Sequence, residues 1–173
     1  MKRFGINLII TGLFAALVIV LGLFLSGCSS NFEWFKVNTP PSYKVVQNTK
    51  SMVVFSKSKD TDLNRFKIED CTILIELRRR EPGTKFEGAA QFTENITSDS
   101  SVSWTDNGSR NAGGLEFYVC SSFMPDGTET VMGFADINEK YSVGFRSYKL
   151  SNDDPTLWKM LSSLTIYESK LPD

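Results

Sequence analysis

Three cysteines, Cys28, Cys71 and Cys120, are the most reactive side chains in this sequence, because the chain contains no histidine. The absence of imidazole excludes Ser-His-Asp and Cys-His catalysis and the usual zinc and non-haem iron sites. The sequence also lacks a Gly-x-Ser-x-Gly motif, a Cys-x-x-Cys motif and a phosphate-binding glycine loop. We therefore expect thiol chemistry, meaning acylation or disulfide formation, and no metal or cofactor site.

Cys28 ends a strongly apolar N-terminal segment. Two basic residues open the chain, and no charged residue occurs from Ile6 to Leu25. This pattern is typical of a secretory signal, although about 20 apolar residues can also span a bilayer as a helix. The motif Leu25-Ser26-Gly27-Cys28 resembles the bacterial lipobox, which implies acylation of Cys28, with palmitate among the acyl groups, and cleavage just before it. The alternative is an uncleaved membrane anchor with an accidental cysteine.

The lipobox resemblance divides the chain into three parts. Residues 1–27 form the signal peptide, residues 28–31 a short flexible tether, and residues 32–173 a single domain. Two or three acyl chains anchor a protein stably, since each buried methylene contributes about 0.8 kcal/mol. The same resemblance implies a location on the periplasmic side of the outer membrane or, in a cell without one, on the cell membrane. Trp34, near the anchor, is expected either to pack against the sheet or to rest at the membrane interface.

The charge balance argues against one class of partner. The full chain has a formal charge of −1, and loss of residues 1–27 would remove two basic side chains and no acidic ones. A mildly acidic domain has no broad positive field that could hold a nucleic acid. We therefore expect the membrane and an envelope protein as partners, and no nucleic acid.

Cys71 and Cys120 are candidates for a disulfide, because they would lie outside the cytosol. Such a bond would contribute about 4 kcal/mol in the loop-entropy model. Against it, an extended chain places Cys71 on an apolar face and Cys120 on a more polar one, and a bridge requires Cβ atoms that face each other. The alternative is two separate thiols, one of them buried.

Arg78 and Arg80 share one face of a predicted strand, with Arg79 on the other. One interpretation is a contact with an anion or with anionic lipid near the membrane. The other is that these arginines pair with Glu76 and Glu81 and protect the edge of a sheet. The sequence leaves both open.

Two acidic pairs, Glu69-Asp70 and Asp153-Asp154, could in principle supply a general acid and a general base. That chemistry needs carboxylates that face each other across a cleft. Here the first pair precedes a predicted strand and the second is placed to cap a helix. We therefore expect a protein that is not an enzyme.

The spacing of apolar residues predicts mostly strands. The clearest covers 71–80, and further strands are predicted near 32–39 and over 43–46, 51–57, 114–123, 129–137 and 141–150. Pro125-Asp126-Gly127-Thr128 predicts a hairpin turn. Residues 98–114 are rich in turn formers, with a short strand near Trp104.

Two helices complete the predicted fold. Residues 151–164 carry a helix capped by Asp153 or Asp154, with Pro155 in the first turn. Residues 84–96 fit a weaker helix, because Gly88 lies inside it. Residues 164–169 are expected to add an edge strand. The sum is an α+β fold, an antiparallel β-sheet with one or two packed helices.

This order of elements resembles one known family. The aromatic, proline-containing entry FKVNTPPSY at 35–43, the central meander, and the last helix running into SSLTI at 162–166 resemble the PsbP/DcrB-like family over about 32–168. The resemblance implies a sandwich around an antiparallel sheet and a non-enzymatic accessory or binding role. We therefore expect a lipoprotein that acts as a binding or accessory module in the cell envelope. The alternative is a carrier of a small apolar ligand or lipid, held in a pocket between sheet and helix.

Overall fold

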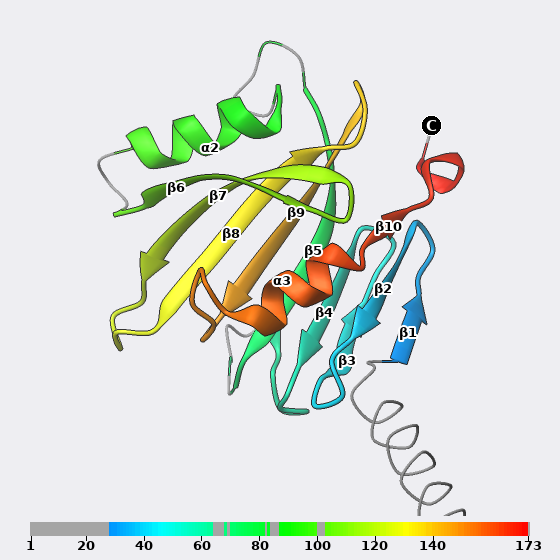
Figure 1. Ribbon diagram of the computed structural model, residues 1–173, viewed down its shortest axis with the longest axis vertical. Helices are drawn as coiled ribbons and strands as arrows, with labels where there is room; N and C mark the ends of the chain where they lie inside the picture. The colour runs from blue at the N-terminus through cyan, green and yellow to red at the C-terminus, as the bar shows by residue number, and fades with distance from the viewer. Residues whose placement is uncertain are drawn as a thin grey trace, which may run out of the picture.

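Two antiparallel sheets form the frame of this α+β protein (Figure 1). The computed structural model describes residues 28–63, 68, 70–81, 83, 87–99 and 103–172. The large sheet has seven strands in the order β3-β4-β5-β9-β8-β7-β6, and the small sheet has three in the order β1-β2-β10. The large-sheet strands are β3 (Lys44–Asn48), β4 (Met52–Ser56), β5 (Thr72–Arg79), β6 (Thr105–Ala112), β7 (Leu115–Phe123), β8 (Glu129–Asp136) and β9 (Tyr141–Tyr148). The small-sheet strands are β1 (Cys28–Asn31), β2 (Phe35–Thr39) and β10 (Thr165–Ile166).

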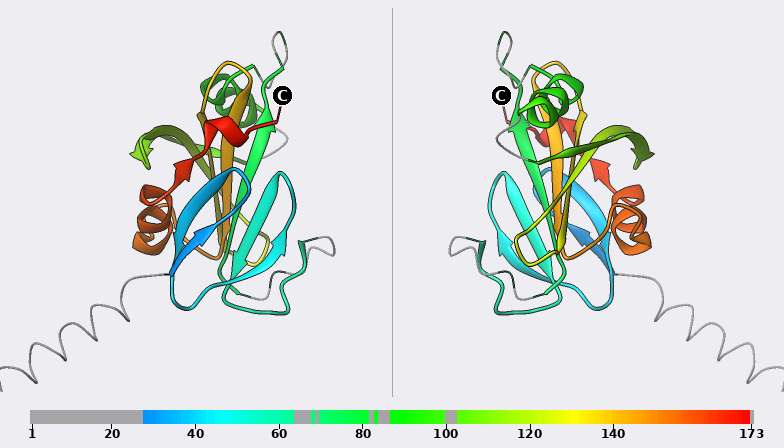
Figure 2. Two further views of the ribbon diagram at one scale, coloured as in Figure 1. Left: turned by 90° about the vertical axis from the view of Figure 1, so that its right-hand side faces the viewer. Right: turned by 90° about the vertical axis from the view of Figure 1, so that its left-hand side faces the viewer.

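Each face of the large sheet has its own apolar cluster. The small sheet and helix α3 (Pro155–Ser162) lie together on one face (Figure 2) and enclose the larger cluster, which includes Trp34, Phe55 and Phe145. Helix α2 (Ala89–Ser98) covers part of the other face over a smaller cluster around Cys120, Met132 and Phe134. A short 3-10 helix, η2 (Glu168–Lys170), follows β10. The two helices therefore pack on opposite faces of the large sheet.

The strand β5 shows why the chain forms this central layer. Ile73, Ile75 and Leu77 alternate along it and are buried in the larger cluster. The intervening residues point to the face that α2 partly covers, as period-two alternation requires. β5 pairs with β4 on one side and β9 on the other. The predicted strand over 71–80 is thus confirmed, but it is an interior strand, so its arginines protect no sheet edge.

The turn and cap predictions are also confirmed. In the β7–β8 turn, Gly127 has φ +80° and its amide donates to the Met124 carbonyl at 2.8 Å. Asp154 is the N-cap of α3, where its carboxylate accepts from the Thr156 amide at 2.7 Å, and Pro155 begins the helix.

Trp34 is buried against the sheet, at 2% exposure. The edge strand expected within 164–169 is β10, which pairs with β2.

Three predictions need correction. Residues 28–31, expected to be a flexible tether, form β1 and pair with β2 from Cys28–Thr39 onward. Most of the turn-rich stretch 98–114 is β6, an eight-residue strand paired with β7. Helix α2 covers Ala89–Ser98, whereas a helix over 84–96 was expected. Gly88 is its N-cap and therefore lies outside the helix.

Both outer strands of the large sheet are irregular. The register of β3 against β4 shifts between Val45 and Gln47. The register of β6 against β7 shifts between Asp106 and Ser109, with Gly108 at φ +74°. Such bulges bend a strand locally and interrupt its ladder of hydrogen bonds.

Candidate functional site

Cys28 is exposed and is the first residue of β1. β1 is tied to the domain through its pairing with β2, and the Ser30 and Thr39 hydroxyls lie 2.9 Å apart. Immediately after β1, Phe32 stacks on Phe35, with ring centroids 4.7 Å apart. No flexible spacer therefore separates Cys28 from the folded domain. The other residues of the predicted lipobox, 25–27, lie outside the described residues.

The end of the molecule that holds Cys28 can be traced through the strand registers. Cys28 pairs with Thr39, and the chain then turns into β3 at Lys44. Along this rim of the large sheet, the pairs Lys44–Ser56, Ser56–Thr72, Thr72–Tyr148 and Tyr148–Thr130 lie side by side. The β7–β8 turn, residues 124–128, closes the same rim (Figure 1). We call this rim the Cys28 end, and the opposite rim, with the β8–β9 turn, the distal end.

Among the described residues, no helix is long and apolar enough to cross a membrane. The same part of the chain holds no group of three or more histidine, cysteine or acidic side chains placed to bind a metal ion.

Cys71 and Cys120 form no disulfide, so that prediction is wrong. Cys71 packs at the margin of the larger cluster and its thiol donates to the Lys149 carbonyl at 3.2 Å, whereas Cys120 is buried in the α2 cluster on the opposite face. Their Cβ atoms therefore cannot meet. Burial raises the pKa of both thiols, that of Cys120 to about 12 with a further contribution from the Asp106 carboxylate. Both thiols are thus weak nucleophiles at neutral pH.

Arg78 and Arg80 share the face of the sheet that α2 partly covers. The Arg78 side chain pairs with Glu76, with Nε and Oε1 2.8 Å apart. Its guanidinium group also lies over the Phe92 and Phe134 rings, 5.2 Å and 5.1 Å from their centroids. The cavity left beside these residues holds about 20 Å³, room for about one water molecule. Arg78 thus contacts Phe92 of α2 and Phe134 of β8, whose rings meet edge to face with centroids 4.5 Å apart.

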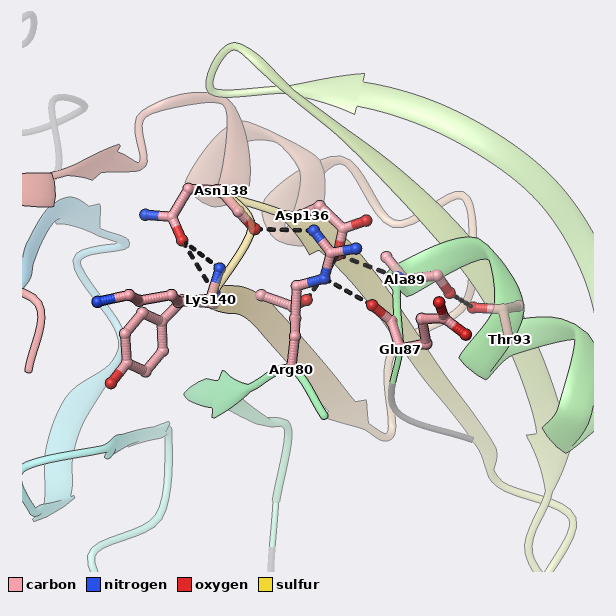
Figure 3. Close-up of polar contacts among 9 residues, drawn as sticks. Arg80, Glu87, Ala89, Thr93, Asp136, Asn138 and Lys140 are labelled. Atoms are coloured by element: carbon pink, nitrogen blue, oxygen red, sulfur yellow. Dashed lines mark hydrogen bonds and ion pairs between the residues drawn. The ribbon is translucent and has the colours of Figure 1, made fainter. Parts of the chain in front are cut away.

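Arg80 connects β5 with the start of α2 and the β8–β9 turn (Figure 3). Its Nε donates to the Glu87 carbonyl at 2.6 Å, and its Nη1 donates to the Asn138 carbonyl at 2.8 Å. The Asp136 carboxylate lies 3.8 Å from Nε and accepts from the Ala89 amide at 3.0 Å. Since Gly88 offers no side-chain cap, Asp136 supplies the acceptor that the first turn of α2 lacks. The geometry gives Arg78 and Arg80 a role in positioning α2, and an anion contact at these residues stays a prediction.

The sequence did not point to Asp136, Asn138 or Glu87 as partners of Arg80. The three contacts join residues that are seven to 58 positions apart, and two of them use backbone carbonyls, which carry no sequence signature. One signal was available in the sequence: Asp136 is an acidic residue at the end of an apolar strand, which indicates a polar contact at that position.

The acidic pairs contribute to local structure. Asp70 accepts from the Cys71 amide at 2.6 Å, and this hydrogen bond lowers the pKa of the Asp70 carboxyl. Asp154 caps α3, and Asp153 is exposed beside it. Glu69 lies outside the described residues.

Two hollows lie at opposite ends of the large sheet. One, of about 190 Å³, lies at the Cys28 end beside the β7–β8 turn, and Met124, Thr130 and Tyr148 are among its lining residues. The other is an open groove of about 540 Å³ at the distal end, lined by Asn138, Glu139, Lys140, Tyr141, Glu168, Ser169, Leu171 and Pro172. We call the second hollow the distal groove.

Comparison with known proteins places no family on this chain. No family model matches the sequence, and no curated protein matches it. A crystal structure of a protein from Bacteroides thetaiotaomicron is similar to this chain at 11% sequence identity, with a TM-score of 0.49. The match covers 86% of this chain and 51% of that one, so this chain spans about half the length of its structural relative.

Proposed function

We propose that this protein is a lipoprotein of the bacterial cell envelope, acylated at Cys28, whose single domain binds another envelope component without catalysing a reaction. The observation that carries the proposal is the position of Cys28. It follows Leu25-Ser26-Gly27 in the sequence, and in the fold it is the exposed first residue of β1. The finer assignment to the PsbP/DcrB-like family belongs to this proposal, and the α+β architecture supports it.

If the protein is anchored through Cys28, its distal end would point away from the membrane. Because β1 begins at Cys28 and pairs at once with β2, the acyl chains would hold the Cys28 end against the bilayer. The distal groove would then face away from the membrane, with Glu139, Lys140 and Glu168 offering charges of both signs. A mixed, open surface of this kind suits a protein partner better than a small apolar ligand.

The alternative, a carrier of an apolar ligand, has less support. The cavity between the large sheet and α2 holds about 20 Å³, which is too small for an acyl chain or a comparable molecule.

Acylation is tested by feeding the native host an alkyne-bearing fatty acid and measuring the intact mass of the purified protein. We expect cleavage before Cys28, a mass increase from two or three acyl chains, and recovery in the membrane fraction. Cys28→Ala should abolish labelling, whereas Cys71→Ala, the matched control, should retain it. A mature protein that keeps residues 1–27 and carries an unmodified Cys28 would falsify the anchor.

The partner is tested by photo-crosslinking in intact cells. A photoreactive residue at Lys140, in the distal groove, should give a discrete adduct whose mass identifies an envelope protein. The same residue at exposed Ser109 on β6 is the matched control and should give none. Absence of any adduct from several positions around the groove would count against a protein partner at this surface.

A further inference from the structure

The most exposed large apolar side chains of the described residues gather at one end of the molecule. Phe123 is 71% exposed, Val45 44% and Met124 43%. Phe123 and Met124 lead into the β7–β8 turn, and Val45 is the second residue of β3. All three lie at the Cys28 end. Single exposed apolar residues such as Val45 are ordinary on a protein surface, but Phe123 and Met124 are adjacent and lead into one turn at the end that carries Cys28.

The turns at the distal end are polar. Its β8–β9 turn contains Asn138, Glu139 and Lys140, and the neighbouring β3–β4 turn contains Thr49, Lys50 and Ser51. The two ends of the large sheet thus differ in their exposed side chains, and the apolar ones lie at the end where β1 begins.

The β7–β8 turn holds its apolar residues in a fixed position. The Met124 amide donates to the Thr128 carbonyl at 2.8 Å, and the Thr128 amide donates to the Asp126 carboxylate at 2.9 Å. Pro125 has its own φ fixed by its ring, and Gly127 takes the left-handed φ of +80° that the turn requires. Phe123 and Met124 therefore project from an ordered hairpin, which lowers the conformational entropy lost when these side chains are buried at a binding surface.

From these observations we infer that Phe123 and Met124 insert into the surface of the bilayer to which Cys28 is anchored, as a second membrane contact. The inference rests on the proposed acylation of Cys28. Exposed charges of both signs, Asp126 and Lys149, lie beside the tip. The contact is therefore apolar in origin and does not require anionic lipid.

The test uses the full chain, purified in acylated form and reconstituted into vesicles of brominated phosphatidylcholine. Bromine on the acyl chains quenches tryptophan that enters the hydrocarbon region. Phe123→Trp and, separately, Met124→Trp provide the probes, and Lys140→Trp at the distal end is the matched control. The signal of the unsubstituted chain, with Trp34, Trp104 and Trp158, is subtracted in each case. The intact mass of the same preparation reports acylation.

We expect the probe at 123 or 124 to be quenched several-fold more strongly than the probe at 140, with little change in high salt. Equal quenching at both ends in acylated protein overturns the inference and leaves the anchor intact. A blue shift at position 123 without quenching by brominated lipid also overturns it, in favour of a contact with protein or with a second copy. An unmodified Cys28 in the mass spectrum overturns the proposed function, and the inference with it.

Discussion

Gly133 and Phe145 lie opposite each other in the β8–β9 ladder, and the ring of Phe145 fills the space beside Gly133. A Cβ atom at position 133 would lie 2.9 Å from Cζ of Phe145 and closer still to Cε1. Next along the ladder the pair is reversed: Phe134 lies opposite Gly144, where a Cβ would lie 2.8 Å from Cε1 of the Phe134 ring. One ring packs toward α3 and the other toward α2. The two glycines thus let the sheet carry an aromatic ring close to each face.

Gly133→Ala should destabilise the protein. The added methyl would force Phe145 out of its position in the core, and such overpacking typically costs about 1–3 kcal/mol. The opposing gain, a less flexible unfolded chain, is only about 0.4–1 kcal/mol. Urea unfolding measures the difference. The double variant Gly133→Ala/Phe145→Leu should lose less than the sum of the two single variants, and strict additivity would show that the ring is not the cause.

Gly113 and Gly114, in the β6–β7 turn, form a matched pair. Both have positive φ, +59° and +78°, so alanine strains the backbone at either position. Only at Gly113 would a Cβ also meet neighbours, 2.7 Å from the Leu164 carbonyl oxygen and 2.8 Å from that of Leu161. Thermal unfolding should therefore show a loss of about 1 kcal/mol for Gly114→Ala and at least 1 kcal/mol more for Gly113→Ala. Equal losses would mean that the turn does not press on the end of α3.

Asp136→Ala should loosen α2. The substitution removes the acceptor for the Ala89 amide and for the Ser142 hydroxyl, which lie 3.0 Å and 2.6 Å from Oδ1. The expected loss of stability is about 1–3 kcal/mol. Hydrogen exchange followed by mass spectrometry should show faster exchange in α2 and unchanged exchange in α3. Asp136→Asn keeps an acceptor and should restore part of the protection, while Glu139→Ala, which removes an exposed charge from the same turn, should leave α2 unaffected.

The buried Cys120 thiol makes stability depend on alkaline pH. Its pKa is about 12 in the folded protein and about 8.5 in an unfolded chain, so the folded state holds the proton more tightly. Its contribution is therefore fully present below about pH 8.5 and is lost as the pH rises toward 12, by up to about 1.4 kcal/mol for each pH unit. Urea midpoints measured from pH 8 to 10 should fall less steeply for Cys120→Ala than for the parent chain. Parallel slopes would show that this thiol does not titrate on unfolding.

Local signals in the sequence accounted for much of the fold. The alternation of Ile73, Ile75 and Leu77 was sufficient to identify β5, because one face of that strand is uniformly apolar. The turn at 125–128 and the cap at Asp154 were also predictable, since each depends on residues within a few positions of one another. Position 28, the candidate site, was predicted from its neighbours in sequence alone.

Long-range packing accounts for what the sequence did not show. β6 is almost entirely polar and exposed, so no hydrophobic period distinguishes it from a loop, and its pairing with β7 makes it a strand. β1 is also short and polar, so its pairing with β2, and no hydrophobic period, makes it a strand. The disulfide between Cys71 and Cys120 was expected from the compartment, but Cys71, just before β5, packs against the larger cluster, whereas Cys120 on β7 lies in the smaller cluster on the opposite face. The contacts of Arg80 could not be predicted, because they depend on which loops lie beside the end of β5 in the fold.

The bulges in β3 and β6 bear on how copies of the domain would meet if Cys28 is acylated as proposed. Lipid anchoring confines copies of a protein to two dimensions and raises the chance that open strand edges meet. Regular outer strands would then invite copies to join edge to edge and polymerise. Here each outer ladder is interrupted, between Val45 and Gln47 on one side and between Asp106 and Ser109 on the other. Each outer strand of the large sheet is therefore a less regular template for edge-to-edge pairing with another copy.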